Sequence, residues 1–182
     1  RNDARGYGLV TKSLHWITVL ALVAQFTIGY SMVRFDDLGE AFADRWLGGE
    51  EERLLTVHVA LGVSILVLAL VRVSWRRLTP LPPWAEGLSE TERRVESRLE
   101  QALYLTLFLI PLTGLSLVFL TGEEWEIGGR EWRSTAELAD FDTLLTAHIV
   151  THVLFFLVLA VHVGLVLKHQ LIDRDRLLNR ML

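Results

Sequence analysis

Four long apolar stretches constrain this chain more than any other feature of its sequence. They cover residues 14–33, 54–73, 102–120 and 144–167, and each is close to the ~20 apolar residues that an α-helix needs to cross a bilayer. Because backbone N–H and C=O groups find no water in the hydrocarbon region, these stretches are expected to be helices. The sequence therefore predicts an all-α integral membrane protein, an up-down-up-down four-helix bundle that forms a single transmembrane domain over residues 1–182.

Lysine and arginine predict which way the bundle faces. Residues 1–13, the connection from Arg72 onward and the C-terminal tail carry 13 of the 18 basic residues, whereas connections 34–53 and 121–143 carry 5. Because cytoplasmic segments retain lysine and arginine, both termini and the linker 74–101 are expected in the cytoplasm, with the protein multi-pass in the bacterial inner membrane. The two outer connections hold 14 acidic residues, a formal charge of −9, and are expected to attract a basic partner.

Local signals refine this organisation. The first stretch is expected to be mature structure, since it is too long for the apolar region of a signal peptide and lacks a small-residue cleavage site. In the linker, prolines predict an extended start, and Ser89 followed by Glu92 predicts a helix start that leads into the third span. Pro111 predicts a kink in that span.

The absence of cysteine excludes several cofactors. Disulfides, iron–sulfur clusters and covalently attached c-type haem all need cysteine. Any haem must therefore be held non-covalently. No nucleic-acid partner is expected.

Histidines lie within the apolar stretches, where an ionisable side chain is costly and is functional by default. His148 and His162 are 14 residues apart, so they lie on nearly the same helix face, about 21 Å apart along the axis. In an antiparallel bundle, His15 is then level with His162 near the inner surface. His58 is level with His148 near the outer surface.

Two imidazoles that face each other across a bundle core suit the axial positions of a haem iron. The two pairs therefore predict two stacked b-type haems, with these four histidines as iron ligands. Gly29 and Gly62 are expected to leave room beside the outer haem, although glycines also serve helix packing. Arg72 and Arg76 are expected to pair with haem propionates, although arginines at a cytoplasmic helix end also follow the positive-inside rule.

Two further histidines have open roles. His152 is turned by about 80° from His162 around the helix; it contacts a haem edge or another helix, or it replaces His148 as ligand. His169 lies just past the inner end of the fourth span. It is either an interfacial histidine or, with Arg72, part of a site that exchanges protons with a quinone.

The chain resembles the bacterial cytochrome b561 family, part of a wider group of four-helix di-haem membrane cytochromes that includes hydrogenase cytochrome b subunits. The resemblance covers nearly the whole chain, and its motifs are LHW (14–16), VHVALGVSILVLALVRV (57–73), the histidine pair of the fourth span and KHQLIDRDRLLNRML (168–182). It implies two b-type haems, bound by His15 with His162 and by His58 with His148. Some members oxidise superoxide and reduce ubiquinone, and others relay electrons between quinone and partner proteins.

The expected function is that of a di-haem b-type cytochrome, an oxidoreductase that transfers electrons between a periplasmic partner and the membrane quinone pool, ubiquinone or menaquinone. A superoxide:ubiquinone oxidoreductase is an alternative that the acidic outer face opposes, although Arg130 and Arg133 offer local positive charge. Another is a cytochrome b subunit of a larger respiratory complex. A transition-metal carrier is a non-redox alternative, opposed by the absence of Asp, Glu and Cys from the span cores. A scaffold without a cofactor would leave the intramembrane histidines unexplained.

Overall fold

Four long helices dominate the computed structural model, which describes residues 2, 6–32, 41, 44–45, 52–84, 88–134, 136–174 and 177–181. All four are long and apolar enough to cross a membrane. They are α1 (Leu9–Ser31), α3 (Glu52–Leu78), α4 (Glu90–Leu120) and α5 (Phe141–Leu167). Each predicted apolar stretch lies in one of these helices, except that the first stretch was predicted to end at residue 33 and α1 ends at Ser31. Val33, most of connection 34–53 and linker residues 85–87 lie outside the described residues.

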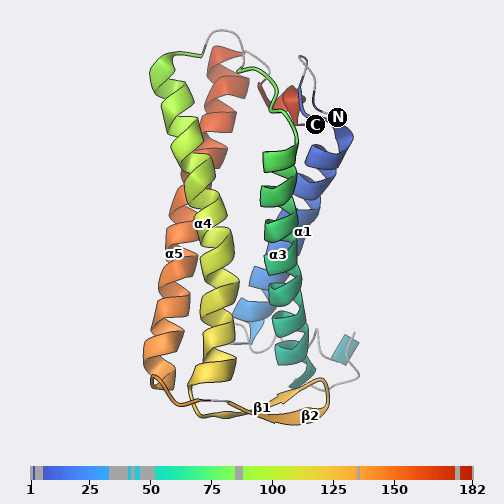
Figure 1. Cartoon of the computed structure of the whole chain (residues 1–182), viewed down its shortest axis with the longest axis vertical. Helices are drawn as coiled ribbons and strands as arrows, with labels where there is room; N and C mark the ends of the chain where they lie inside the picture. Colours follow the sequence, from blue (N-terminus) through green and yellow to red (C-terminus); the bar gives the residue numbers. More distant parts are fainter. Residues whose placement is uncertain are drawn as a thin grey trace.

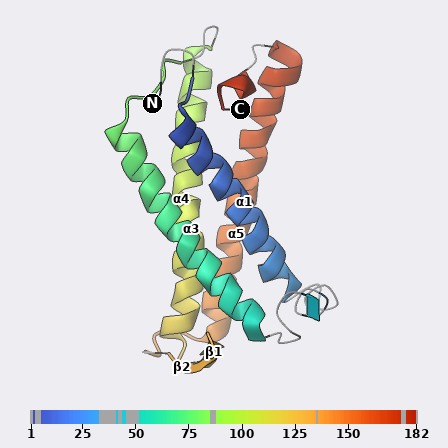
Figure 2. The ribbon, with the colours of Figure 1, turned by 90° about the vertical axis from the view of Figure 1, so that its right-hand side faces the viewer.

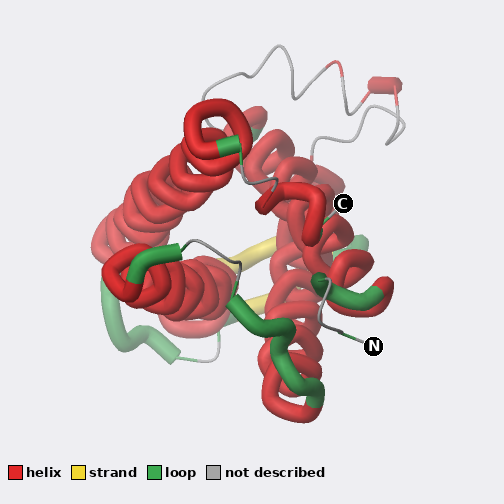
Figure 3. Tube along the Cα trace, turned by 90° about the horizontal axis from the view of Figure 1, so that it is seen from above, coloured by secondary structure: helices red, strands yellow, loops and turns green. Residues whose placement is uncertain are grey.

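The helices are arranged as two neighbouring pairs. α4 packs against α5, α1 packs against α3, and α3 also contacts α4 (Figure 1). Turning the molecule by 90° shows α1 and α3 side by side, both inclined across α4 and α5 behind them (Figure 2). Both chain ends lie at one end of the molecule, here called the termini end, and the strands β1 (Glu124–Ile127) and β2 (Arg130–Arg133) lie at the opposite end, the hairpin end. From above, the strands are visible between the helices (Figure 3).

Large apolar side chains cover the outer faces of the helices. Leu20, Leu105 and Leu157 are 68%, 59% and 61% exposed, and an apolar surface of this extent is covered by lipid in a membrane protein. The interior holds two small apolar clusters, one around Ile28 and Leu54 and one formed by Ile65, Ala69 and Leu107.

The predicted start of α4 at Ser89 is confirmed. The Ser89 hydroxyl accepts a hydrogen bond from the Glu92 N–H at 3.2 Å, and the Glu92 carboxylate accepts one from the Ser89 N–H at 2.9 Å. This capping box satisfies two backbone donors that a helix start leaves unpaired. The helix then continues through Pro111 to Leu120.

Asp140 marks the start of α5 in a similar way. Its carboxylate accepts hydrogen bonds from the Thr143 N–H at 2.9 Å and from the Thr143 hydroxyl at 2.8 Å. These bonds favour the charged carboxylate and hold its pKa below the usual range.

A two-stranded hairpin corrects the expectation of an all-α chain. β1 and β2 pair antiparallel, with Trp125 opposite Trp132, and are joined by Gly128 and Gly129 at φ +65° and +70°. Two successive positive φ angles make a turn that glycine adopts without strain. The Gly128 N–H donates to the Thr56 hydroxyl at 3.0 Å, so the hairpin is tied to the start of α3. The alternation EWEI-GG-REWR is a sequence signal from which the hairpin could have been predicted.

The C-terminal segment folds back on the start of α1. α5 continues as the π-helical turn η1 (Lys168–Asp173), and Arg174 ends it in the left-handed region at φ +56°. The short 3-10 helix η2 (Leu177–Arg180) follows. The Trp16 indole N–H donates to the Met181 carbonyl at 3.1 Å, which fixes the chain end beside α1.

Replacing the helix cap tests this account of α4. Ser89→Ala removes the hydroxyl that caps the helix, and we expect it to lower the free energy of unfolding by about 1 kcal/mol. Thermal unfolding of the detergent-solubilised protein, followed by circular dichroism, measures the loss. Ser64→Ala is the control, because the exposed Ser64 hydroxyl bonds only to the Ala60 carbonyl of its own helix, and its effect should stay within about 0.5 kcal/mol. Equal melting of the two variants would contradict the capping account.

Candidate functional site

Three histidines gather toward the hairpin end of the bundle. His148 lies within electrostatic range of His58 and His152, and the ring centroids of His148 and His152 are 4.3 Å apart. His58 comes from α3 and the other two from α5. The structure thus brings together the two members of the predicted outer pair, and it places His152 beside them.

The imidazole of His58 lies against two residues of α1, the backbone of Gly29 and the side-chain amide of Gln25. A Cβ on Gly29 would lie 2.8 Å from His58 Cε1, so only glycine lets the imidazole approach α1 this closely. The Gln25 Nε2 is 3.2 Å from His58 Nε2, and a Cβ on Gly62 would lie 3.3 Å from that Gln25 nitrogen. Gly29 therefore makes room for the imidazole itself, and Gly62 makes room for the glutamine.

Two buried atoms at this point have no hydrogen-bond partner among the described residues. They are Nδ1 of His58 and Oε1 of Gln25, which is only 5% exposed. Burying a polar atom without a partner is unfavourable. Such atoms therefore mark a place where a ligand can supply the missing interaction.

His148 is held by α4. It is 8% exposed, and its Nδ1 lies 2.9 Å from the hydroxyl oxygen of Thr113. A Cβ on the next residue, Gly114, would lie 3.0 Å from His148 Cε1. Each imidazole of the outer pair therefore rests on a glycine of a neighbouring helix.

His152 has aromatic neighbours. Its ring centroid is 5.1 Å from that of Phe26 and 6.1 Å from that of Tyr30, in both cases with the rings steeply inclined. The side chain thus lies between α1 and the ring of His148. Of the roles left open by the sequence, contact with another helix is the one that the structure describes.

A second group of polar residues lies nearer the termini end. His15 is within electrostatic range of His162 and Arg72, which brings the predicted inner pair together with one of the two predicted arginines. The Arg72 guanidinium carbon lies 5.6 Å from the centroid of the Tyr104 ring. Arg72 is therefore a cation beside both histidines of this level.

Arg76, the other predicted arginine, is engaged elsewhere. Its guanidinium donates two hydrogen bonds to the carboxylate of Glu100. A bidentate pair of this kind joins the end of α3 to α4. Arg76 is thus committed to Glu100, whereas Arg72 lies beside the histidines.

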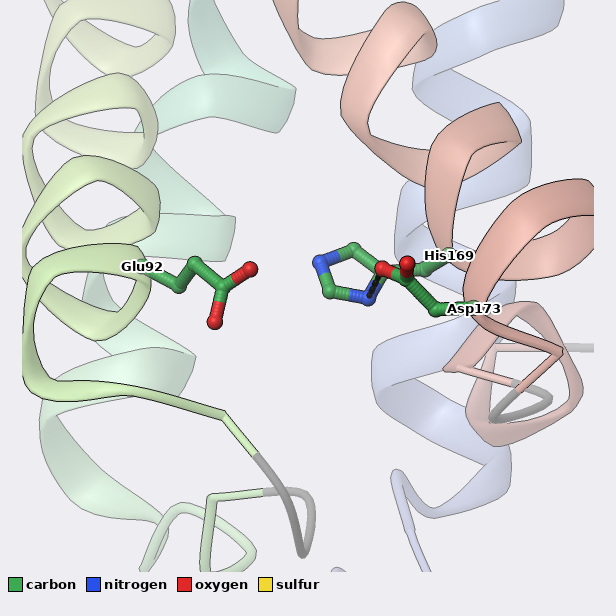
Figure 4. Close-up of side chains that lie close together, drawn as sticks. All are labelled: Glu92, His169 and Asp173. Atoms are coloured by element: carbon green, nitrogen blue, oxygen red, sulfur yellow. Dashed lines mark ion pairs between the residues drawn. The ribbon is translucent and has the colours of Figure 1, made fainter.

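The π-helical turn η1 brings His169 into an ionic cluster with α4 (Figure 4). His169 is 3% exposed, with Nδ1 3.2 Å from the Asp173 carboxylate and Nε2 3.9 Å from the Glu96 carboxylate. The Lys168 ammonium bridges Glu92 at 3.1 Å and Asp173 at 2.7 Å. Because the Lys168 ammonium already links the carboxylates of Glu92 and Asp173, we interpret the group as an ion-pair network and not as a metal centre.

A cavity of about 180 Å³ adjoins this cluster between α4 and the end of α5. Glutamate and histidine side chains reach it together with aliphatic ones. Its lining residues are Thr91, Glu92, Val95, Glu96, Leu165, Lys168 and His169.

Sequence reasoning missed Gln25, Thr113 and the carboxylates around His169. Gln25 had a usable signal, since it is the sole amide in the first apolar stretch and stands one turn before Gly29. Thr113 had none, because threonine is common in spanning helices and its hydroxyl can bond to its own backbone. Asp173 had a usable signal, since it stands four residues after His169, a spacing at which helical side chains meet.

The chain is similar in sequence to known proteins. A sequence model described as prokaryotic cytochrome b561 matches residues 6–182. The chain is 27% identical over 188 residues to cytochrome b561 homolog 2 of Escherichia coli (strain K12), covering 100% of this chain and 93% of the relative. It is 26% identical over 178 residues to cytochrome b562 of Cereibacter sphaeroides, covering 97% and 95%.

Matched glycine substitutions test the close approach at His58. Gly29→Ala forces a methyl group against the imidazole, and we expect overpacking to lower the free energy of unfolding by about 1–3 kcal/mol. Gly164→Ala is the control, because a Cβ there meets no atom within 4 Å, and the better helix propensity of alanine should leave stability unchanged or raise it by up to about 1 kcal/mol. Thermal unfolding in detergent measures both. If Gly29→Ala is as stable as Gly164→Ala, the close contact is absent.

Proposed function

Because this chain belongs to the prokaryotic cytochrome b561 family, we propose that it is a di-haem membrane cytochrome that transfers electrons between a periplasmic partner and the membrane quinone pool. Membership of the family confirms the resemblance seen in the sequence and implies a multi-pass membrane protein with b-type haem and a role in electron transport. The number of haems, their ligands, the quinone link and the partner are our proposal. The observation that carries it is the grouping of the four histidines at two levels.

The residues at the hairpin-end level fit one haem, with His58 and His148 as axial ligands. The bond of His148 to Thr113 uses its Nδ1, so Nε2 of that ring remains for iron. The Nδ1 of His58 lies against Gly29 and its Nε2 against the Gln25 amide, so iron binding by His58 requires that Gln25 release this Nε2. Gly29 and Gly114 let α1 and α4 support the two imidazoles. When bound, haem would supply reversible one-electron oxidation and reduction, and ligation by two histidines would suit electron transfer.

The termini-end level fits the second haem, with His15 and His162 as ligands. Arg72 lies within electrostatic range of both histidines, so its guanidinium is placed to pair with a propionate. Arg76 is a weaker candidate for that role, since it is already bound to Glu100. His148 and His162 are about 21 Å apart along α5, so haems held at the two levels would serve opposite membrane surfaces.

We further propose that the termini end faces the cytoplasm of a bacterial inner membrane and that the helices run up-down-up-down. Two contacts support alternating helix directions. The Trp75 indole near the end of α3 donates to Thr11 near the start of α1, while His58 near the start of α3 meets Gly29 near the end of α1. The excess of lysine and arginine outside the two acidic connections supports the orientation.

Quinone reduction is proposed at the termini end, near His169 and Arg72. His169 is buried between the carboxylates of Asp173 and Glu96, beside the cavity between α4 and α5. Quinone reduction consumes protons as well as electrons, and an imidazole held by carboxylates can pass protons from the surface.

The hairpin end favours a basic periplasmic redox protein over superoxide as the electron donor. Arg133, which offered local positive charge, pairs with Glu124 at 3.8 Å. The two outer connections carry a formal charge of −9, so they attract anions poorly and attract a cationic protein patch.

Loss of one predicted ligand tests the di-haem proposal. In wild type, a dithionite-reduced minus oxidised spectrum should show two b-type haems per chain, and His162→Ala should reduce the number to about one. His152→Ala is the control and should retain two, since His152 packs against aromatic rings. A colourless wild type would contradict the cytochrome proposal and favour a metal carrier.

The quinone proposal is tested by the rate at which a ubiquinone analogue reoxidises the reduced protein in stopped flow. Asp173→Asn removes a carboxylate from His169, and we expect at least about tenfold slower reoxidation, since proton transfer by a positioned group contributes about 10²–10⁴-fold. Haem content and haem potentials serve as the control and should match wild type. An unchanged rate would contradict a quinone site at this end.

A further inference from the structure

We propose that Thr113 is the positioning residue of His148: its hydroxyl oxygen accepts the imidazole Nδ1–H and thereby presents Nε2 to iron. This inference rests on the proposed function, because it supposes that a haem is bound at the hairpin-end level. It adds a residue of α4, a helix that carries none of the four proposed iron ligands.

The hydroxyl proton of Thr113 has acceptors other than the imidazole. The oxygen lies 2.8 Å from the Leu109 carbonyl and 3.0 Å from the Ile110 carbonyl. Carbonyl oxygens can only accept, so we assign the single hydroxyl proton to them. The lone pairs of Thr113 are then available to the His148 Nδ1 at 2.9 Å.

A neighbouring hydroxyl completes the same assignment. The Thr151 hydroxyl donates to the His148 carbonyl at 2.7 Å, and its oxygen lies 3.3 Å from that of Thr113. The protons of both hydroxyls are thus directed to backbone carbonyls. With both protons so placed, we assign the imidazole as the donor in its bond with Thr113, the same direction as its hydrogen bond to the Ile110 backbone.

This direction of the bond decides which nitrogen can bind a metal. A neutral imidazole carries one N–H, so placing it at Nδ1 leaves the lone pair on Nε2 free. Histidine ligands of metals commonly donate their other N–H to an oxygen, which fixes the ring and makes the ligand more basic. Thr113 supplies that oxygen, and the adjacent Gly114 admits the Cε1 edge of the ring.

The hydrogen bond to Thr113 also distinguishes His148 from His152 as the iron ligand. His152 is one turn further along α5, and its ring contacts are with Phe26, Tyr30 and His148. An aromatic ring face fixes no tautomer. We therefore assign the ligand role to His148, and the bond to Thr113 carries that assignment.

The matched variants are Thr113→Val, which keeps the shape of the side chain but removes its oxygen, and Thr113→Ser, which keeps the oxygen. Thr106→Val is the control on the same helix. Thr106 is 4% exposed and its hydroxyl bonds only to the Ala102 and Leu103 carbonyls. All are made in the full chain and purified with haem.

Three quantities are measured: the midpoint potential of each haem, the rate of haem loss to an apoprotein acceptor, and the electron paramagnetic resonance of the ferric protein. Thr113→Val should shift one midpoint potential to a more positive value, because a less basic ligand stabilises the ferric state less. It should also weaken binding of that haem by about 10–100-fold and change one of the two ferric signals. Thr113→Ser and Thr106→Val should behave as wild type.

The outcomes separate this inference from the function on which it rests. If Thr113→Val keeps both potentials and both haems, or if Thr106→Val shifts them equally, Thr113 does not position His148, while two haems in wild type still support the cytochrome. If wild type holds no haem at this level, the proposed function fails and the inference falls with it. Should Thr113→Val not fold, Thr113→Ala against Thr113→Ser makes the same comparison.

Discussion

The structure depends on the high cost of placing polar groups in an apolar medium. A helix satisfies its own backbone there, but an imidazole or an amide must find a partner inside the bundle. Gln25, His58 and His148 meet this demand by contacts between helices. The contacts concentrate polar chemistry between the helices and leave the outer faces to apolar side chains.

The two ends of the bundle hold their polar residues by different means. At the hairpin end, glycines let helix backbones approach imidazoles closely, and single hydrogen bonds orient the rings. At the termini end, ion pairs such as Arg76 with Glu100 and Lys168 with Glu92 join the helices. Near water, a charged pair loses little solvation free energy. Deeper in the apolar region the desolvation penalty of a charged pair is larger, so close packing around a neutral imidazole costs less free energy.

Most of the fold follows from local patterns. The four helices contain the apolar stretches, and Ser89 with Glu92 marked the start of α4 correctly, because capping involves residues three apart. The hairpin was missed although Gly128 and Gly129 stand between alternating residues, since the expectation of an all-α chain assigned the whole connection to a loop. His169 and Asp173 are four residues apart, so helical spacing alone could have predicted their contact, whereas the contact of His169 with Glu96 joins two helices and was not predictable.

By itself the sequence determined that the chain spans a membrane, and that His148 and His162 share one face of a helix. These are properties of a single segment: its length, its apolarity and its spacing. Only the tertiary structure decided that Gly29 faces His58, that Gln25 bonds to it, and that Thr113 holds His148. Such contacts depend on the depth and rotation of one helix against another, which packing sets and no pattern within one helix records.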